Sequence, residues 1–404
     1  MQQQFFKGLV PLFLAACLVM AGALYSRANP ASGVSVQAIS FPNKAITLAG
    51  NLYLPEGFDA HGRYSAVICV HPAGSVKEQT AGLYARRLAE QGFVTLAFDA
   101  SYVGESGGEP RYVEDPFARM EDIHCAVDYL TTLPYVDEER IGALGICAGG
   151  GYVMAVTPTE RRIKAAVGVS TADIGSTNRD GWLGGASVEA QIAKLEAVAA
   201  QRTREARGAA PLWHPITPDT LEGDASGAFA NPALRDLERK SQPGEAFPAT
   251  FVEAYDYYRT PRGQHPRSVN RMLFVSGDKK MLFSAVNVTT KLFTQPVLFV
   301  VGSRADSRHH SQAIYDAIPG TNKEIYTIEG ASHVDLYDRP QYVGQAVQKM
   351  TAFYKKAFAM QEDCAEKARK AALTDAAVTD GPENAAGAEK SARGRVAAKE
   401  DNRR

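Results

Sequence analysis

A cysteine stands at the centre of a glycine-rich pattern, Gly145–Gly149, which spells Gly-Ile-Cys-Ala-Gly. The pattern follows a short apolar run, Arg140–Leu144, that indicates a buried strand, and it opens the segment Ala148–Val156, which indicates a helix. Glycines allow a sharp strand-to-helix turn, and such a turn presents its central side chain as a nucleophile. A helix N-terminus also favours a thiolate. The pattern therefore predicts acyl chemistry through a thioester on Cys147, and the alternative is a buried structural cysteine.

A second segment, Gly104–Gly108, carries the related pattern Gly-Glu-Ser-Gly-Gly around Ser106. Five residues separate it from the end of the apolar strand Phe93–Phe98, and it leads into Glu109-Pro110 rather than into a helix. These differences favour a glycine-rich loop over a nucleophile turn. We therefore expect Ser106 to be structural.

Composition excludes several classes of function. The chain has 404 residues, 45% of them hydrophobic and 22% charged, which is typical of a globular protein. Its net charge of −1 gives no electrostatic support for nucleic-acid binding. The five cysteines form no C-x-x-C pair, and the eight histidines form no H-E-x-x-H motif. We expect neither a metal nor a cofactor.

The two ends of the chain differ from its centre. Lys7 precedes an apolar run from Gly8 to Tyr25, so residues 1–28 fit a secretory signal peptide, a lipoprotein signal lipidated at Cys17, or an uncleaved membrane anchor. All three predict an exported protein that is periplasmic or attached to a membrane through its N-terminus. Residues 361–404 nearly lack large apolar side chains, which predicts a disordered tail, with helix near Asp363–Leu373 as an option.

Strand and helix signals alternate along most of the chain. Strands are predicted over 36–41, 45–54, 65–70, 93–98, 140–144, 164–170, 296–301 and 323–328, and helices over 79–91, 116–133, 148–156, 307–318 and 341–358. The first two strands read as an antiparallel hairpin, and the later alternation predicts a largely parallel sheet. The alternation breaks over 171–290, which we interpret as a cap inserted above the carboxyl edge of the sheet.

Three motifs carry a resemblance to a known family: His71-Pro72-Ala73-Gly74, Gly145–Gly149 and Gly330-Ala331-Ser332-His333. With them, residues 36–170 and 291–358 resemble the α/β-hydrolase fold, and most closely its dienelactone-hydrolase-like branch with Cys at the nucleophile turn. The resemblance implies an α/β protein with a mostly parallel eight-stranded sheet flanked by helices. Fungal polyketide acyltransferases resemble the same branch, so hydrolysis is not the only chemistry implied.

The resemblance also implies roles for particular residues. Cys147 would be the nucleophile, His333 the base, and Asp306, in the loop after the penultimate strand, the acid that orients the histidine. Asp335 is the competing acid. The oxyanion would be bound by the backbone N–H groups of Ala148 and of Ala73, whose neighbour Pro72 has none, while His71 shapes that loop.

A cluster of aromatic and basic residues lies in the predicted cap, and it includes Tyr258, Arg259 and Arg262. It is interpreted either as a substrate-facing gate that recognises a carboxylate or as an aromatic anchor for the cap. The sequence thus predicts a hydrolase that cleaves a small ester, lactone or thioester through a covalent Cys acyl-enzyme. The alternatives are an acyltransferase with the same site and a non-catalytic binding protein, and the oligomeric state stays open.

Overall fold

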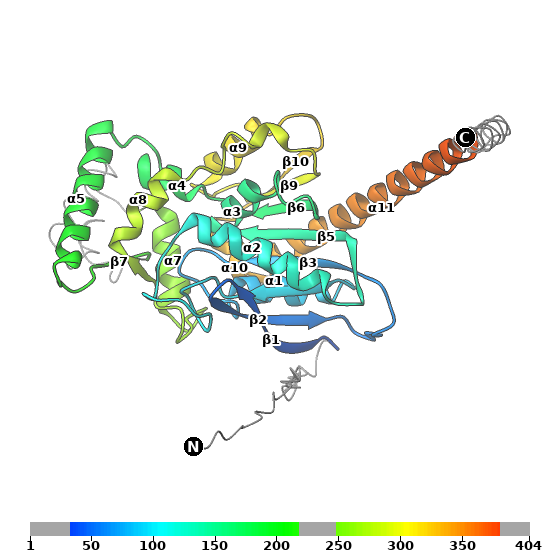
Figure 1. Ribbon diagram of the computed structural model, residues 1–404. Coiled ribbons are helices and arrows are strands. Elements are labelled where there is room, and N and C mark those ends of the chain that lie inside the picture. Colours follow the sequence, from blue (N-terminus) through cyan, green and yellow to red (C-terminus); the bar gives the residue numbers. More distant parts are fainter. Residues whose placement is uncertain (1–32, 218–247, 380–404) are drawn as a thin grey trace, which may run out of the picture.

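The computed structural model describes residues 33–217 and 248–379, and its centre is an eight-stranded sheet (Figure 1). The strands are β1 (Ser35–Asn43), β2 (Ile46–Leu54), β3 (Tyr64–Val70), β4 (Val94–Phe98), β5 (Val136–Ile146), β6 (Ile163–Val169), β9 (Val297–Gly302) and β10 (Lys323–Ile328). Their order across the sheet is β1-β2-β4-β3-β5-β6-β9-β10. Pairing is antiparallel from β1 through β2 to β4 and parallel from there on, which confirms the predicted hairpin and the mostly parallel sheet.

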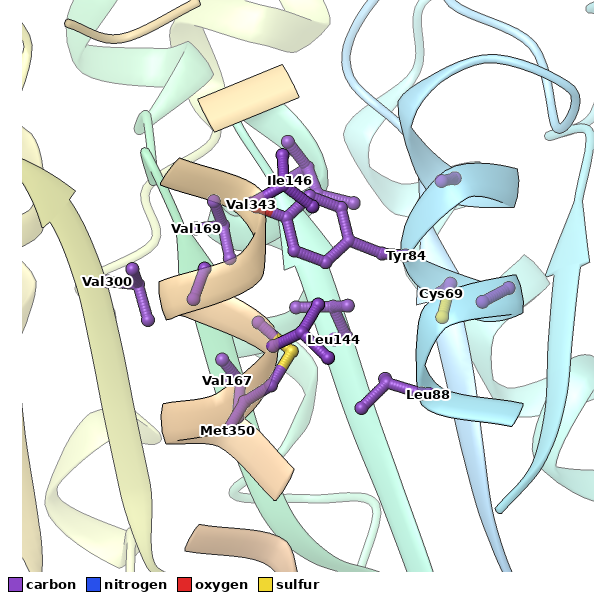
Figure 2. Packing of buried hydrophobic residues seen from close by; sticks show 14 of the residues in the cluster. Cys69, Tyr84, Leu88, Leu144, Ile146, Val167, Val169, Val300, Val343 and Met350 are labelled. Atoms are coloured by element: carbon purple, nitrogen blue, oxygen red, sulfur yellow. The ribbon is translucent and has the colours of Figure 1, made fainter. Parts of the chain in front are cut away.

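Helices cover both faces of the sheet. On one face lie α1 (Thr80–Ala89) and α11 (Pro340–Thr379), and on the other lie α2 (Pro116–Thr131), α3 (Ala148–Val156) and α9 (Arg308–Ala317). Figure 2 shows how side chains of β5, β6 and β9 meet Tyr84 and Leu88 of α1 and Val343 and Met350 of α11. The central strands are apolar on both sides because helices cover both faces of the sheet.

The segment between β6 and β9 forms the predicted cap. It contains α4 (Ile174–Arg179), α5 (Val188–Ala206), β7 (Trp213–Pro215), α7 (Ala249–Arg259), β8 (Arg271–Leu273), the 3-10 turns η2 (Phe274–Ser276) and η3 (Thr290–Leu292), and α8 (Gly277–Leu282). In Figure 1 these elements gather at the end of the sheet from which α3 starts. A short helix, α10 (Asp335–Asp338), follows β10 and precedes α11. The cap therefore lies at the carboxyl edge of the parallel strands.

The last helix is longer than predicted. Helix was expected to end at Phe358, whereas α11 continues to Thr379, which agrees with the option of helix near Asp363–Leu373. Alanine, lysine and glutamate in this segment favour helix, and a helix anchored on the sheet extends without a new nucleation step. Residues 380–404 lie outside the described residues.

The predicted signal segment, residues 1–28, also lies outside the described residues, so the expectation of export stays a prediction. Over 33–217 and 248–379, no helix combines the length and the apolar character that crossing a bilayer requires.

Candidate active site

The backbone bends sharply at Cys147. β5 ends at Ile146, α3 begins at Ala148, and Cys147 between them has φ of 54° and ψ of −121°. Its N–H donates to the carbonyl oxygen of Val169, 3.0 Å away, which ties the bend to β6. A Cβ atom at Gly149 would lie 2.4 Å from the Val70 carbonyl oxygen, so only glycine fits there. The chain thus has the strand-turn-helix geometry that the glycine pattern predicts, although the predicted strand was shorter than β5.

The thiol of Cys147 is a free thiol in a mostly buried setting. Burial raises its pKa, while the hydrogen bond between the sulfur and the Tyr337 hydroxyl and the one with the Ala148 N–H lower it. The negative charge of Glu114 raises the pKa further, and the positive charge of Arg119 opposes this. The effect of burial on the pKa outweighs the effect of the helix N-terminus, so the resting group is a neutral thiol. Burial thus opposes the effect of the helix N-terminus, which the sequence predicts to favour a thiolate, and the depth of burial is not visible in the sequence.

His333 lies in the loop after β10 and is only 1% exposed. Its Nδ1 is 2.5 Å from the Ser307 hydroxyl, and its Nε2 is 3.1 Å from the Tyr337 hydroxyl. The ring of Trp182, from the cap, covers it with a centroid distance of 5.4 Å. Burial lowers the pKa of His333 to about 4, and the charge of Asp306 acts in the opposite direction. The imidazole is therefore neutral at ordinary pH and is linked to Cys147 through Tyr337.

Asp306 does not hold the ring as predicted. Its carboxylate accepts from the Trp182 Nε1–H at 3.1 Å, from the backbone N–H of Thr250 at 3.1 Å, and from the Thr250 hydroxyl. Among the described side chains, the contact with Nδ1 of His333 comes from Ser307 instead. The cap supplies the donors that occupy Asp306, and the sequence did not reveal that these residues meet. Asp306 acts on the imidazole through its charge.

The competing acid, Asp335, is also engaged elsewhere. Its carboxylate accepts from the backbone N–H of Ser332 at 3.1 Å and pairs with Arg339 at 3.7 Å. The Ser332 hydroxyl in turn accepts from the Asp335 N–H at 3.1 Å. These reciprocal bonds shape the loop that carries His333, so Asp335 orients the backbone rather than the ring.

The loop His71–Gly74 adjoins the start of α3. Nε2 of His71 accepts from the Ala100 N–H at 3.1 Å, so we assign the ring hydrogen to Nδ1, which donates to the Pro72 carbonyl oxygen at 2.7 Å. Burial and the charge of Arg119 hold the pKa of His71 well below its usual range. His71 is a neutral ring that shapes this loop, as expected. A Cβ at Gly149 would also come within 2.8 Å of the His71 carbonyl oxygen, which brings the loop against α3.

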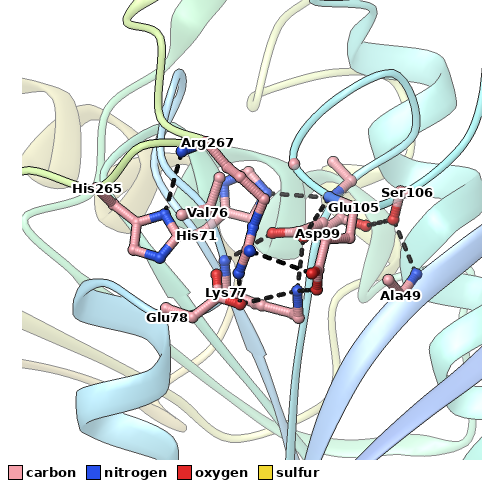
Figure 3. Close-up of polar contacts among 12 residues, drawn as sticks. Ala49, His71, Val76, Lys77, Glu78, Asp99, Glu105, Ser106, His265 and Arg267 are labelled. Atoms are coloured by element: carbon pink, nitrogen blue, oxygen red, sulfur yellow. Dashed lines mark hydrogen bonds and ion pairs between the residues drawn. The ribbon is translucent and has the colours of Figure 1, made fainter.

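A buried network of charged side chains lies next to the loop His71–Gly74 (Figure 3). The Lys77 ammonium pairs with Asp99 at 2.9 Å, with Glu78 at 2.9 Å and with Glu105 at 2.5 Å. Arg267 of the cap pairs with Glu105 at 3.1 Å and also with Glu78. The network fixes the position of the loop relative to the cap, because a buried ammonium without these partners is strongly unfavourable.

Ser106 belongs to this network and not to the site. Its hydroxyl donates to the Asp99 carbonyl oxygen at 2.6 Å and accepts from the Ala49 N–H at 2.9 Å. It is 1% exposed. These bonds agree with the expectation that Ser106 is structural.

The three predicted substrate-binding residues have different environments. Tyr258 is 5% exposed, and its hydroxyl lies near Ser75, Tyr337 and Cys147. Arg262 donates to both carboxylate oxygens of Asp338, at 2.9 and 2.6 Å, and to Asp256 at 3.0 Å. These ion pairs commit Arg262 to holding α10, so the predicted carboxylate recognition does not fit it.

Arg259, the last residue of α7, donates to the carbonyl oxygen of Thr217 at 3.5 Å. The rings of Tyr257, Tyr258 and Tyr337 pack edge to face, with centroid distances of 4.8 Å between the first two and 5.3 Å between the first and the last. These contacts fit the anchor interpretation of the cluster, and Tyr258 also lies close to Cys147.

Sequence reasoning missed Tyr337, Ser307 and Trp182. Tyr337 comes four residues after His333, a spacing that places two side chains on one face of a helical turn, so a signal was present. Ser307 follows Asp306 directly, whereas nothing in the sequence pointed to Trp182. Over residues 33–217 and 248–379, no three His, Cys, Asp or Glu side chains are arranged to hold a metal ion.

Comparison with known proteins identifies the family of the chain. The pattern of the Dienelactone hydrolase family matches residues 48–171. Uncharacterized protein YcjY of Escherichia coli (strain K12) is 40% identical over 312 residues, which cover 77% of this chain and 95% of that protein. The chain belongs to the dienelactone hydrolase family. It is an α/β-hydrolase enzyme.

A solved structure supports the same fold for this dienelactone hydrolase family member. The hypothetical protein PA2218 of Pseudomonas aeruginosa superposes with a TM-score of 0.70 at 34% identity, over 81% of this chain and 94% of that one. Two fungal relatives have names that state an activity. Thiohydrolase aneE of Aspergillus aculeatus is 31% identical over 42% of this chain and 52% of its own length. Polyketide transferase af380 of Aspergillus fumigatus is 25% identical over 66% of this chain and 81% of its own length.

Proposed function

We propose that this enzyme cleaves an ester, lactone or thioester of a small molecule through a covalent acyl group on Cys147. The observation that supports this most directly is the bend at Cys147. It holds the thiol at the N-terminus of α3 and beside the loop His71–Gly74. The side chain of Tyr337 contacts both the thiol and His333. A nucleophile, a base and a backbone loop able to bind an oxyanion are the parts that acyl transfer requires.

In the proposed reaction the thiol sulfur attacks the substrate carbonyl and its proton passes to His333. The N–H groups of Ala148 and Ala73 bind the oxyanion of the tetrahedral intermediate. When the intermediate collapses, the bond to the leaving oxygen or sulfur breaks and His333 returns the proton to it. Water then repeats the sequence on the thioester, which releases the acid and restores the thiol.

The electrostatics suit a site that is neutral at rest. A neutral imidazole is ready to accept a proton, and the nearby carboxylate of Asp306 stabilises the imidazolium that forms. The resting thiol is less prone to oxidation than a thiolate. That property matters for an exported protein, in which a reactive cysteine meets oxidising conditions.

Tyr258 is the proposed contact to the substrate. Its hydroxyl is buried close to Cys147, Ser75 and Tyr337. From there it would donate a hydrogen bond to a polar group of the bound acyl substrate.

Acyl transfer to an acceptor other than water is the second candidate, because af380 is named a polyketide transferase. Thiohydrolase aneE instead favours thioester hydrolysis. Both proceed through the same acyl-enzyme and differ only in what attacks it. A non-catalytic binding protein is disfavoured, because the family is one of enzymes.

A substrate panel tests the proposal. p-Nitrophenyl esters, acyl thioesters and lactones are offered to the wild type and to Cys147→Ala, each with and without a small alcohol or amine acceptor. We expect turnover of at least one class by the wild type and none above background by the variant. A product that shifts from free acid to acylated acceptor would assign transfer, and equal turnover by the two proteins would refute the proposal.

We further propose that the N-terminal 28 residues export the enzyme to the periplasm or anchor it to the extracytoplasmic face of a membrane. The support is the apolar run after Lys7. Cell fractionation with intact-mass analysis tests this, and Cys17→Ser separates a lipid anchor from the other two options. The full-length unmodified chain in the cytoplasmic fraction would contradict export.

A further inference from the structure

Tyr337 occupies the space between the nucleophile and the base. Its hydroxyl lies 3.1 Å from Nε2 of His333 and is hydrogen-bonded to the thiol of Cys147. Among the described residues, the two ring nitrogens of His333 contact Ser307 and Tyr337 rather than the sulfur. We propose that Tyr337 is a catalytic residue that relays the proton of the Cys147 thiol to His333.

One arrangement of hydrogens satisfies all of these contacts. Nδ1 of His333 donates to the Ser307 hydroxyl, so Nε2 is free to accept. The Tyr337 hydroxyl donates its hydrogen to Nε2 and accepts one from the thiol through a lone pair. The chain from sulfur to imidazole is therefore continuous and charge-neutral.

The relay step balances within this chain. As the sulfur attacks the carbonyl carbon, the S–H bond breaks and a new O–H bond forms at Tyr337, while the original O–H bond breaks and an N–H bond forms at Nε2. Tyr337 has the same composition before and after. Its hydroxyl now donates toward the sulfur, and the imidazolium lies near Asp306, whose charge favours the protonated ring.

The protein holds Tyr337 in neutral form and in place. It is 2% exposed, and burial, with Cys147 as the next contribution, keeps its pKa well above the usual range. A phenol with a raised pKa stays protonated at rest. It therefore gives up one proton only as it accepts another, and it does not remain as a phenolate. The ion pair of Arg262 with Asp338 fixes the end of α10, and the Tyr84 hydroxyl donates to the Leu336 carbonyl oxygen at 2.8 Å. The ion pair with Asp338 gives Arg262 a positioning role.

The test compares Tyr337→Phe with Tyr354→Phe. Tyr354 is fully buried, and its hydroxyl donates to the Ala143 carbonyl oxygen at 2.8 Å, so its variant removes one buried hydrogen bond far from the thiol. The readouts are the rate of Cys147 alkylation by iodoacetamide, followed by peptide mapping from pH 5 to 9, and kcat/KM on the best substrate of the panel. Circular dichroism and thermal unfolding check that each variant folds.

We expect Tyr337→Phe to slow both reactions by roughly 10²-fold, within the range for general acid–base catalysis, and Tyr354→Phe to leave them near wild type. His333→Ala should add little to Tyr337→Phe, because the two act as one unit. An alkylation rate and pH profile of Tyr337→Phe equal to wild type, or faster, would overturn the relay.

Proton inventory on the wild type keeps the proposal testable even if Tyr337→Phe does not fold. Turnover measured in mixtures of H₂O and D₂O should give a bowed plot, because two protons move in one step. A linear plot would contradict the relay. The inference rests on Cys147 as the nucleophile, and the two proposals fail separately: full activity of Cys147→Ala refutes the nucleophile, whereas normal alkylation of Tyr337→Phe refutes only the relay.

Discussion

Two glycine-rich loops with the same spacing fold into different structures. In Gly145–Gly149 the backbone bends at Cys147 with φ of 54°, and a helix starts at the next residue. In Gly104–Gly108 the hydroxyl of Ser106 is bonded to the Asp99 carbonyl oxygen and the Ala49 N–H, and no helix follows before Pro116. Spacing alone therefore does not make a nucleophile. A strand must end immediately before the residue, and a helix must begin immediately after it.

The largest effect should separate the two central side chains. Cys147→Ala should lower kcat by roughly 10⁴-fold or more, because no other group can form the acyl-enzyme. Ser106→Ala should retain most of the activity and lose about 1–3 kcal/mol of unfolding free energy, because it leaves the Ala49 N–H unpaired. Steady-state kinetics and urea unfolding measure both. The reverse pattern would make Gly104–Gly108 the catalytic loop.

The glycines of the two loops should also differ, now in stability. Gly149→Ala places a Cβ 2.4 Å from a backbone oxygen, so we expect a loss of about 3 kcal/mol or more, or failure to fold. At Gly107 the nearest atom to an added Cβ is 3.6 Å away, and Gly107→Ala should stay within about 0.5 kcal/mol of wild type. Chemical denaturation gives both values. Equal stability of the two variants would mean that the bend at Cys147 does not need the close approach at Gly149.

A smaller effect should come from Asp306 and Asp335, the two carboxylates near His333. Asp306→Asn should lower kcat by roughly 10- to 100-fold, which is less than the ~10⁴-fold loss when an acid bonds the histidine directly. Asp335→Asn should change kcat little and should lower thermal stability, since that carboxylate shapes the loop of His333. A loss near 10⁴-fold for Asp306→Asn would show that the working enzyme forms a direct bond to the ring. Asp306→Asn at wild-type rate would remove Asp306 from the mechanism.

The smallest effect concerns pH. His333 must be unprotonated to act as the base, and burial lowers its pKa to about 4, so kcat/KM should fall only as pH drops toward 4. An exposed histidine would instead give an acid limb near 6.5. Because the charge of Asp306 raises the pKa of His333, Asp306→Asn should move the limb to still lower pH. A pH–rate profile of the two proteins checks this, and an acid limb near 6.5 in the wild type would contradict a buried neutral base.

Much of the fold could be predicted from the sequence, and less of the site. Apolar strands and glycine turns are local signals, so the hairpin, the parallel sheet and the bend at Cys147 could be predicted. The contacts of Asp306 could not, since they depend on Trp182 and Thr250, which a long cap brings back to the sheet. The protonation of the thiol also escaped prediction, because burial is a property of packing. Beyond Phe358 the composition left two options open, a disordered tail or helix near Asp363–Leu373, and α11 continues as helix to Thr379.

The central claim is that the acyl group is carried by Cys147. The direct measurement is rapid acid quench of the enzyme during turnover of a p-nitrophenyl ester, followed by intact-mass analysis and peptide mapping under conditions that preserve thioesters. We predict one added acyl mass, located on the peptide that contains Cys147, and its absence in Cys147→Ala. An acyl group on Ser106 would contradict the account. Normal turnover by Cys147→Ala without any acylated protein would also contradict it.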